Sequence, residues 1–258
     1  KMMGTVLEVR DIIRNYSKKG DGARPSEDDI KVIRGLSLKV EKKDFLGIMG
    51  KSGCGKSTLL RVLGLLDRPT EVKVFFEEFD TEELWKDELA DIRRRKIGFV
   101  FQDYYLMDSL TVRENMILPM ILDKADSKEM QRRAEKYAAQ FELTHLLEKK
   151  PTELSGGEKQ RAAICRALIN DPELILADEP TGNLDSKSGK IVLDALKEIN
   201  GWGKTIIMVT HDPQMASNCK KVILLKDGVI LKTLEGKGDS EEERERYYRE
   251  ILGEMEQL

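Results

Sequence analysis

The chain has 258 residues, with 44 Lys and Arg against 47 Asp and Glu, so its formal net charge is only −3. That length accommodates one large domain or two small ones with a substantial hydrophobic core. The balanced charge argues against a strongly basic nucleic-acid-binding domain, and we expect no nucleic-acid partner. Three widely separated cysteines form neither a disulfide framework nor a zinc-binding set, which favours a reducing compartment. Because no apolar run is long enough to span a membrane and no apolar leader follows the N-terminus, we expect a soluble, cytoplasmic protein.

Short apolar runs alternate along the chain with helical patterns. Alternation of polar and apolar residues over 5–10, 36–40 and 72–76 predicts strands of a partly antiparallel layer. Between 17 and 29 the chain is polar and is predicted to be an exposed excursion. Runs that are apolar on both faces predict buried parallel strands. These runs are 45–49, 97–101, 174–177, 205–209 and 222–225, with helical patterns after 55 and over 156–169 and 186–199. The alternation predicts an α/β fold with a parallel sheet.

Residues 111–150 contain no clear strand, and their apolar side chains recur at helical spacing. We therefore expect a helical subdomain, about 103–165, inserted into a core made of 1–102 and 166–238. Residues 239–258 are predicted to form a separate amphipathic helix, opened by a capping box of Ser240 and Glu243. We expect this helix to pack on its own domain; docking to a partner is the alternative.

Residues 50–57 match the phosphate-loop pattern G-x-x-x-x-G-K-[ST] in full, between an expected strand and an expected helix. Backbone N–H groups of such a loop curl around phosphates, and the helix N-terminus adds partial positive charge. Lys56 is suited to bridge β- and γ-phosphates, and the Ser57 hydroxyl suits Mg²⁺. A plain glycine-rich turn is the alternative. The predicted nucleotide-binding residues here are Gly50, Lys51, Ser52, Gly53, Cys54, Gly55, Lys56, Ser57 and Thr58.

Two carboxylates, Asp178 and Glu179, end the apolar run 174–177. At the carboxyl edge of a parallel sheet they would face the same crevice as the phosphate loop. Asp178 is then suited to hold Mg²⁺, and Glu179 to activate a water as general base. Alone, the pair could equally cap a helix. Together with the loop, it predicts hydrolysis of a nucleoside triphosphate.

Residues 154–161 read Leu-Ser-Gly-Gly-Glu-Lys-Gln-Arg, a pattern that a phosphate-binding fold does not require. Ser155, Gly156 and Gly157 open a helix and form a second anion-binding N-terminus. Two such sites in one chain favour a dimer in which each copy's second site closes on the other's nucleotide. A simple turn and helix cap is the alternative.

With these motifs in this order, the chain resembles the ATP-binding cassette (ABC) subunits of transporters over nearly its whole length. The implied fold is a single P-loop ATPase domain over 1–238, with an antiparallel β subdomain and an inserted α-helical subdomain. In this resemblance 50–57 is the Walker A loop, 174–179 is the Walker B strand with Glu179 as catalytic base, and 154–161 is the signature motif.

Four further residues take their implied roles from the same resemblance. Gln102, after the run 97–101, is similar to the Q-loop glutamine, which contacts Mg²⁺ and the attacking water and senses the membrane subunit. Residues 183–185 are similar to the D-loop, with Asp185 near the nucleotide. His211 is similar to the switch histidine at the γ-phosphate, and Tyr16 to the aromatic residue that stacks on adenine.

Residues 178–185 resemble the lipoprotein-release, macrolide-export, cell-division and peptide-resistance cassettes. The resemblance implies an ATPase whose two copies enclose ATP and Mg²⁺ and move an integral membrane permease at the cytoplasmic face, exporting or extracting a peptide, lipoprotein or drug. Alternatives are a soluble ABC ATPase acting on DNA or ribosomes, a P-loop phosphotransferase, and a non-enzymatic nucleotide-binding scaffold. Residues 69–80 lack the glycines usual in that strand and turn, which puts the local turn geometry in question.

Overall fold

The computed structural model describes residues 4–16, 30–67, 71–238 and 240–257, so the predicted excursion at 17–29 lies outside the described residues. The chain divides into two compact units. The first comprises Lys1–Leu89 and Ile207–Leu258, and the second comprises Ala90–Ile206. The chain leaves the first unit within α2 (Lys86–Lys96) and returns to it within β8 (Thr205–Val209).

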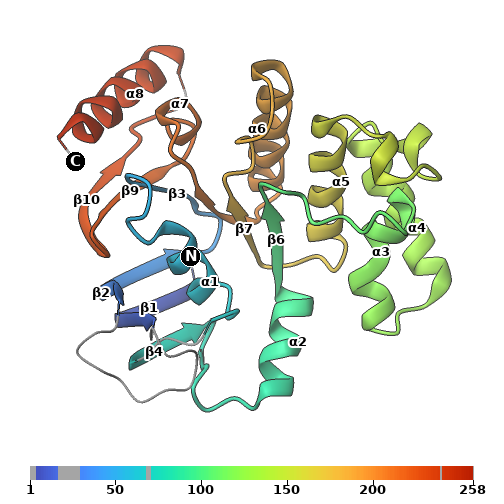
Figure 1. Ribbon diagram of the computed structural model, residues 1–258, viewed down its shortest axis with the longest axis horizontal. Helices are drawn as coiled ribbons and strands as arrows, with labels where there is room; N and C mark the ends of the chain where they lie inside the picture. Colours follow the sequence, from blue (N-terminus) through green and yellow to red (C-terminus); the bar gives the residue numbers. More distant parts are fainter. Residues whose placement is uncertain (1–3, 17–29, 68–70, 239, 258) are drawn as a thin grey trace. The chain divides into compact units, whose positions relative to one another are not determined.

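An antiparallel sheet forms one part of the first unit. It has the order β2-β1-β4-β5, from β2 (Ile30–Glu41), β1 (Thr5–Tyr16), β4 (Glu71–Phe76) and β5 (Phe79–Asp80). β1, β2 and β4 lie side by side in Figure 1. Glu77 has a φ of 53° in the turn between β4 and β5, so this turn forms without a glycine.

The other part of the first unit carries the predicted phosphate loop. β3 (Phe45–Met49) is fully buried and pairs in parallel with β9 (Lys221–Lys226), which pairs antiparallel with β10 (Val229–Glu235). α1 (Lys56–Leu63) follows β3, and α7 (Pro213–Ala216) follows β8. Sequence periodicity missed β10 because most of its side chains are exposed on both faces.

The C-terminal helix α8 (Glu241–Glu256) begins with the predicted capping box. Ser240 Oγ accepts from the Glu243 N–H at 3.2 Å. Buried Tyr247 donates from its hydroxyl to the Leu234 carbonyl at 3.1 Å, so α8 packs on its own unit, as expected. Within the described parts of the chain, no helix combines the length and apolar character needed to cross a bilayer.

The second unit has two parallel strands and most of the helices. β6 (Ile97–Phe101) pairs with β7 (Leu174–Asp178). α3 (Val112–Leu122), α4 (Ser127–Gln140) and α5 (Gly156–Leu168) gather together in Figure 1, and α6 (Ser186–Gly201) follows β7. The 3₁₀ turns η1 (Thr144–Leu146) and η2 (Pro151–Glu153) precede α5.

The helices α3 and α4 fall in the segment 103–165 that we predict to be helical. The sequence pattern missed α2, whose eleven residues bury only Leu89. A helix with one buried side chain has no apolar stripe for periodicity to detect.

Candidate active site

The predicted phosphate loop joins β3 to α1 in the first unit. Gly53 and Gly55 have φ values of 79° and 101°, a region that favours glycine. A Cβ at Gly50 would overlap the Leu225 carbonyl oxygen of β9. The motif's glycines are therefore required by both backbone conformation and close packing.

Lys56 is held inside this loop. Its side chain is buried, and Nζ donates to the carbonyl oxygens of Gly50 at 2.8 Å and Lys51 at 3.1 Å. The N–H groups of the first helical turn have no acceptor within their own helix, and the helix dipole adds partial positive charge there. The loop, the ammonium group and the start of α1 together form a site suited to phosphate oxygens.

Backbone from two other elements supports the loop. The Gly228 N–H donates to the Cys54 carbonyl at 3.2 Å, and the Arg34 N–H donates to the Gly228 carbonyl at 3.0 Å. A cavity of about 240 Å³ lies against this part of the loop. It is lined by Lys51, Ser52, Gly53, Cys54, Leu225, Lys226 and Asp227. Burial raises the pKa of the Cys54 thiol, so this cysteine is not activated as a thiolate.

His211 lies at the same edge of the first unit as the loop. The Thr210 N–H donates to the Ile48 carbonyl at 3.1 Å, which places the end of β8 beside the end of β3. His211 follows directly and is exposed, and Asp212 then caps α7 by accepting from the Gln214 N–H at 2.8 Å. His211 and the phosphate loop thus follow neighbouring strand ends at one edge of the first unit.

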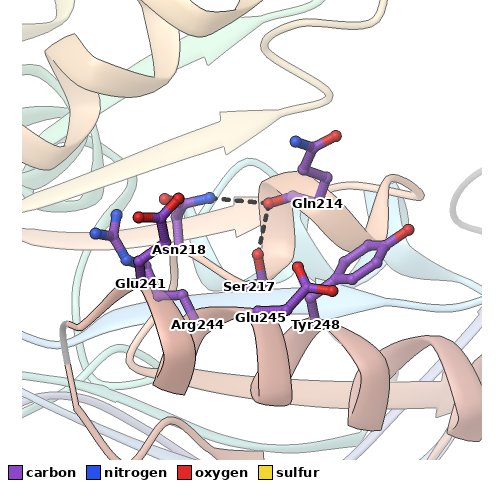
Figure 2. A pocket seen from close by; sticks show the side chains of 7 residues that line it. All are labelled: Gln214, Ser217, Asn218, Glu241, Arg244, Glu245 and Tyr248. Carbon is purple, nitrogen blue, oxygen red and sulfur yellow. Dashed lines mark hydrogen bonds between the residues drawn. The ribbon is translucent and has the colours of Figure 1, made fainter.

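A separate polar cavity of about 360 Å³ lies between α7 and α8 (Figure 2). Ser217 Oγ and Asn218 Nδ2 each donate to the Gln214 carbonyl at 2.8 Å within its wall. The lining residues are Gln214, Ser217, Asn218, Glu241, Arg244, Glu245 and Tyr248, and none of them is a predicted site residue.

In the second unit the parallel pairing of β6 and β7 sets Phe101 opposite Asp178. Gln102 and Glu179 follow these two residues, so both lie at the carboxyl edge of the strand pair. Glu179 has a φ of 45°, and its carbonyl accepts from the Gly182 N–H at 3.0 Å. Left-handed backbone at a non-glycine residue is strained and is concentrated at functional sites.

Gln160, on α5, was not singled out as a site residue by the sequence. It is fully buried, and its Nε2 donates to the carbonyls of Pro180 at 2.6 Å and Phe101 at 3.3 Å. It therefore ties the segment after Glu179 to the end of β6. Its place within the pattern 154–161 was the only sequence signal.

Arg166, also on α5, was missed as well. Its guanidinium donates to the Tyr104 carbonyl at 2.7 Å and to the Tyr105 carbonyl. Tyr104 and Tyr105 have φ values of 61° and 47°, so Arg166 binds two consecutive left-handed residues just after Gln102. Burial lowers the pKa of Arg166. No sequence signal marks it, because a helical arginine is usually solvated.

The predicted second anion site is the start of α5. Ser155 and Glu158 form a capping box, with the Ser155 N–H donating to Glu158 Oε2 at 2.7 Å, and this bond holds the pKa of Glu158 below its ordinary value. Ser155 is exposed. A Cβ at Gly156 would lie 3.0 Å from the Tyr104 hydroxyl, and one at Gly157 would lie 3.1 Å from Ser188. The two glycines therefore permit close packing against the segment after Gln102 and against α6.

Asp185 is the N-cap of α6. Its carboxylate accepts from the Lys187 and Ser188 N–H groups at 3.0 Å and from Ser188 Oγ at 2.6 Å. The hydrogen bond from the Ser188 hydroxyl is the largest cause of its lowered pKa. Tyr16 ends β1 opposite Ile30, and its side chain lies outside the described residues.

The predicted site residues are thus distributed over both units. The first unit holds Tyr16, the phosphate loop and His211, and the second holds the other predicted site residues. These are Gln102, Ser155, Gly156, Gly157, Asp178, Glu179 and Asp185.

Comparison with known proteins adds three similarities to this geometry. The family model described as ABC transporter matches residues 33–182. The macrolide export ATP-binding/permease protein MacB of Campylobacter jejuni is 48% identical over 200 residues, which cover 78% of this chain and 31% of that protein. The lipoprotein-releasing system ATP-binding protein LolD of Aquifex aeolicus is also 48% identical over 200 residues, covering 78% of this chain and 89% of that protein. The chain therefore spans less than a third of MacB but most of LolD.

One of the similar solved structures is matched over the whole of its own chain. It is a dimeric post-hydrolysis state of the ATP-binding cassette MJ0796, bound to ADP and Pi. Its sequence is 39% identical, the TM-score is 0.80, and the match covers 90% of this chain and 100% of that one.

Proposed function

This chain belongs to the ABC transporter family of ATP-binding subunits, and on that premise we propose that it hydrolyses ATP to drive a conformational change in a membrane permease. One observation above all supports the proposal. Lys56 is held inside a complete phosphate loop by the loop's own carbonyl oxygens, with His211 at the same edge of the unit. A site of that kind is built for a triphosphate rather than for a neutral ligand.

The phosphate loop binds the β- and γ-phosphates of ATP. Lys56 supplies the positive charge, and the N–H groups at the start of α1 complete the site. Tyr16 stacks on the adenine. The residues that contact the phosphates are Gly50, Lys51, Ser52, Gly53, Cys54, Gly55, Lys56, Ser57 and Thr58.

Three residues act on the reacting groups. Glu179 accepts a proton from the attacking water, Gln102 orients that water, and His211 contacts the γ-phosphate. Glu179 and Gln102 follow strand residues that lie opposite each other in the β6–β7 pair, which supports a shared role.

The residues proposed to hold Mg²⁺ are Ser57, Gln102 and Asp178. Their donors are a hydroxyl, an amide oxygen and a carboxylate, which is the hard oxygen set that Mg²⁺ prefers beside nucleotide phosphates. When bound, the ion neutralises charge that develops on the phosphate oxygens.

We propose that two copies enclose two ATP molecules. Ser155, Gly156 and Gly157 of one copy contact the nucleotide in the phosphate loop of the other, and Asp185 lies at the same junction. The exposed start of α5 and the dimeric form of the similar cassette support this arrangement. ATP drives work only if it binds the closed dimer more tightly than the open one.

The permease is the proposed membrane partner, with this subunit at the cytoplasmic face. The names of the relatives, macrolide export and lipoprotein release, support export or extraction of a peptide, lipoprotein or drug. Tyr105 and Met107 are 63% and 50% exposed and offer an apolar surface next to Gln102 for this partner.

The Glu179→Gln variant tests the proposed role of Glu179 as the base. Glu173→Gln is the matched control, because Glu173 directly precedes β7 whereas Glu179 directly follows it. We expect Glu179→Gln to retain ATP affinity, to lower phosphate release by about 100-fold or more, and to accumulate an ATP-bound dimer in size-exclusion chromatography. The control should behave as the unmodified chain. Unchanged turnover in Glu179→Gln contradicts its role as base, and turnover that requires a metabolite acceptor favours a phosphotransferase instead.

A further inference from the structure

The Gln102 side chain is held by the segment that follows Glu179. Gln102 Nε2 donates to Asn183 Oδ1 at 3.0 Å. In return, Asn183 Nδ2 donates to the Gln102 carbonyl at 3.3 Å and to Asp103 Oδ1 at 3.1 Å. One side chain thus binds both the amide and the backbone of Gln102.

Gly182 makes room for this arrangement. A Cβ at Gly182 would lie 2.9 Å from Gln102 Nε2 and 3.0 Å from its Cδ. Gly182 is outside the left-handed region, so backbone conformation does not require a glycine here. The space is needed by the Gln102 side chain itself, which lies directly over the Gly182 backbone.

These hydrogen bonds use only the nitrogen end of the Gln102 amide. Across the residues that the structure describes, Gln102 Oε1 has no hydrogen-bond partner. The oxygen is the end of the amide that ligates a hard cation. Held in this way, the amide cannot exchange its two ends without breaking the bond to Asn183.

The holding segment is itself anchored near the proposed base. The Gly182 N–H donates to the Glu179 carbonyl, and the Leu184 N–H donates to the Thr181 carbonyl at 3.1 Å. Gln160 donates to the carbonyl of Pro180. The position of Gln102 is therefore set by the same turn that carries Glu179.

We infer that Gly182 and Asn183 are positioning residues that hold the Gln102 amide with its oxygen available to Mg²⁺. The inference rests on the proposed function, which places Gln102 at the ion. It assigns a role to two residues of the 178–185 segment that the proposed chemistry does not use.

The experiment measures the Mg²⁺ concentration that gives half-maximal ATP hydrolysis, together with thermal unfolding. The variants are Asn183→Ala, Gly182→Ala, Gln102→Ala and the Asn183→Ala/Gln102→Ala double variant. Gly189→Ala on α6 is the matched control, because its added Cβ would meet nothing closer than 3.6 Å. Gly182→Ala and Asn183→Ala perturb Gln102 by independent routes, overlap and loss of hydrogen bonds.

We expect Asn183→Ala and Gly182→Ala each to raise the half-maximal Mg²⁺ concentration by about threefold to tenfold, as loss of one or two hydrogen bonds implies. Gly189→Ala should not change it. In the Gln102→Ala background, Asn183→Ala should add nothing, because residues that act through one another are not additive.

Three results overturn the inference. One is a Gln102→Ala effect that neither Asn183→Ala nor Gly182→Ala reproduces. Another is multiplication of the Asn183→Ala and Gln102→Ala effects in the double variant, which means that Asn183 acts independently of Gln102. An unchanged Mg²⁺ dependence in Gln102→Ala also overturns it, and that result, unlike the other two, shows that the proposed role of Gln102 has failed.

Discussion

Three of the described non-glycine residues with left-handed backbone lie close to Gln102 or are the proposed base itself. Glu179, Tyr104 and Tyr105 all have left-handed backbone, and each such residue costs on the order of 1–3 kcal/mol. Hydrogen bonds from α5 and from the Gly182 turn hold them there. A residue distant in sequence, Arg166, holds Tyr104 and Tyr105, whereas a local turn holds Glu179.

Substitution of Gly228, in the turn between β9 and β10, tests whether backbone packing supports the phosphate loop. Gly228 and Gly35 have φ values of 79° and 75°, but only at Gly228 would a Cβ overlap a neighbour, the Val32 carbonyl. We expect Gly35→Ala to lower the free energy of unfolding by about 1 kcal/mol, and Gly228→Ala to lower it further because its Cβ also overlaps a backbone carbonyl. Only Gly228→Ala should weaken ATP binding, by about fivefold to tenfold, because it displaces the N–H that supports the Cys54 carbonyl.

Calorimetric titration with ATP and thermal unfolding measure these two effects separately. Equal ATP affinities in the two variants would mean that the turn between β9 and β10 contributes to stability alone.

At the scale of elements, α5 makes hydrogen bonds to both segments of the second unit that carry the proposed chemistry. Its N-cap Ser155 is exposed for the proposed contact with a partner's nucleotide, while Gln160 and Arg166 bind the segments after Glu179 and Gln102. One helix therefore connects the signature motif to the two segments that carry the proposed chemistry. A shift of α5 would move the Arg166 guanidinium, and with it the backbone of Tyr104 and Tyr105 just after Gln102.

The helix α4 carries a pH-dependent ion-pair cluster at its start. Glu129 accepts from Arg132 at 2.7 Å and from Arg133 at 2.6 Å, and these bonds, led by that from Arg132, lower its pKa from 4.5 to about 2. A lowered pKa stabilises the fold above the unfolded-state value, so this contribution is complete above about pH 4.5 and is lost as pH falls toward 2.

Carboxyl chemical shifts measured by NMR across that pH range report the Glu129 titration. Arg132→Gln should move the midpoint upward toward the ordinary value. A midpoint near 4.5 in the unmodified chain would show that the cluster does not form in solution.

At the scale of the whole molecule, the proposed dimer requires each site to combine residues of two copies. Lys56→Ala disables the loop, and Ser155→Arg blocks the contact to the partner's nucleotide. Each variant alone should be inactive. A 1:1 mixture should recover about a quarter of the normal activity, because half of the dimers are mixed and each mixed dimer has one intact site.

Phosphate release by the mixture, measured against each variant alone, checks this. No recovery on mixing would contradict shared sites, provided that co-purification of one variant with an affinity-tagged copy of the other shows that mixed dimers form. Activity of Ser155→Arg alone would contradict them as well.

Local sequence determined much of this protein. The phosphate loop, its flanking elements β3 and α1, and the capping boxes at Ser155 and Ser240 depend on residues only a few positions apart. Spacing is enough to predict such features, because their hydrogen bonds close within one turn of chain. The structure also confirms the strands predicted at 97–101 and 205–209. They could be predicted because a largely buried strand shows as a run of apolar residues.

Tertiary structure alone decided which polar side chains support the proposed chemistry. Gln102 and Asn183 are 81 residues apart, Gln160 and Phe101 are 59 apart, and Arg166 and Tyr104 are 62 apart. The sequence singled out Gln102 and placed Asn183 and Gln160 within motifs, but it did not indicate which partner any of these side chains binds. A pattern of neighbouring residues carries no information about such pairs, because their geometry is set by how strands and helices pack.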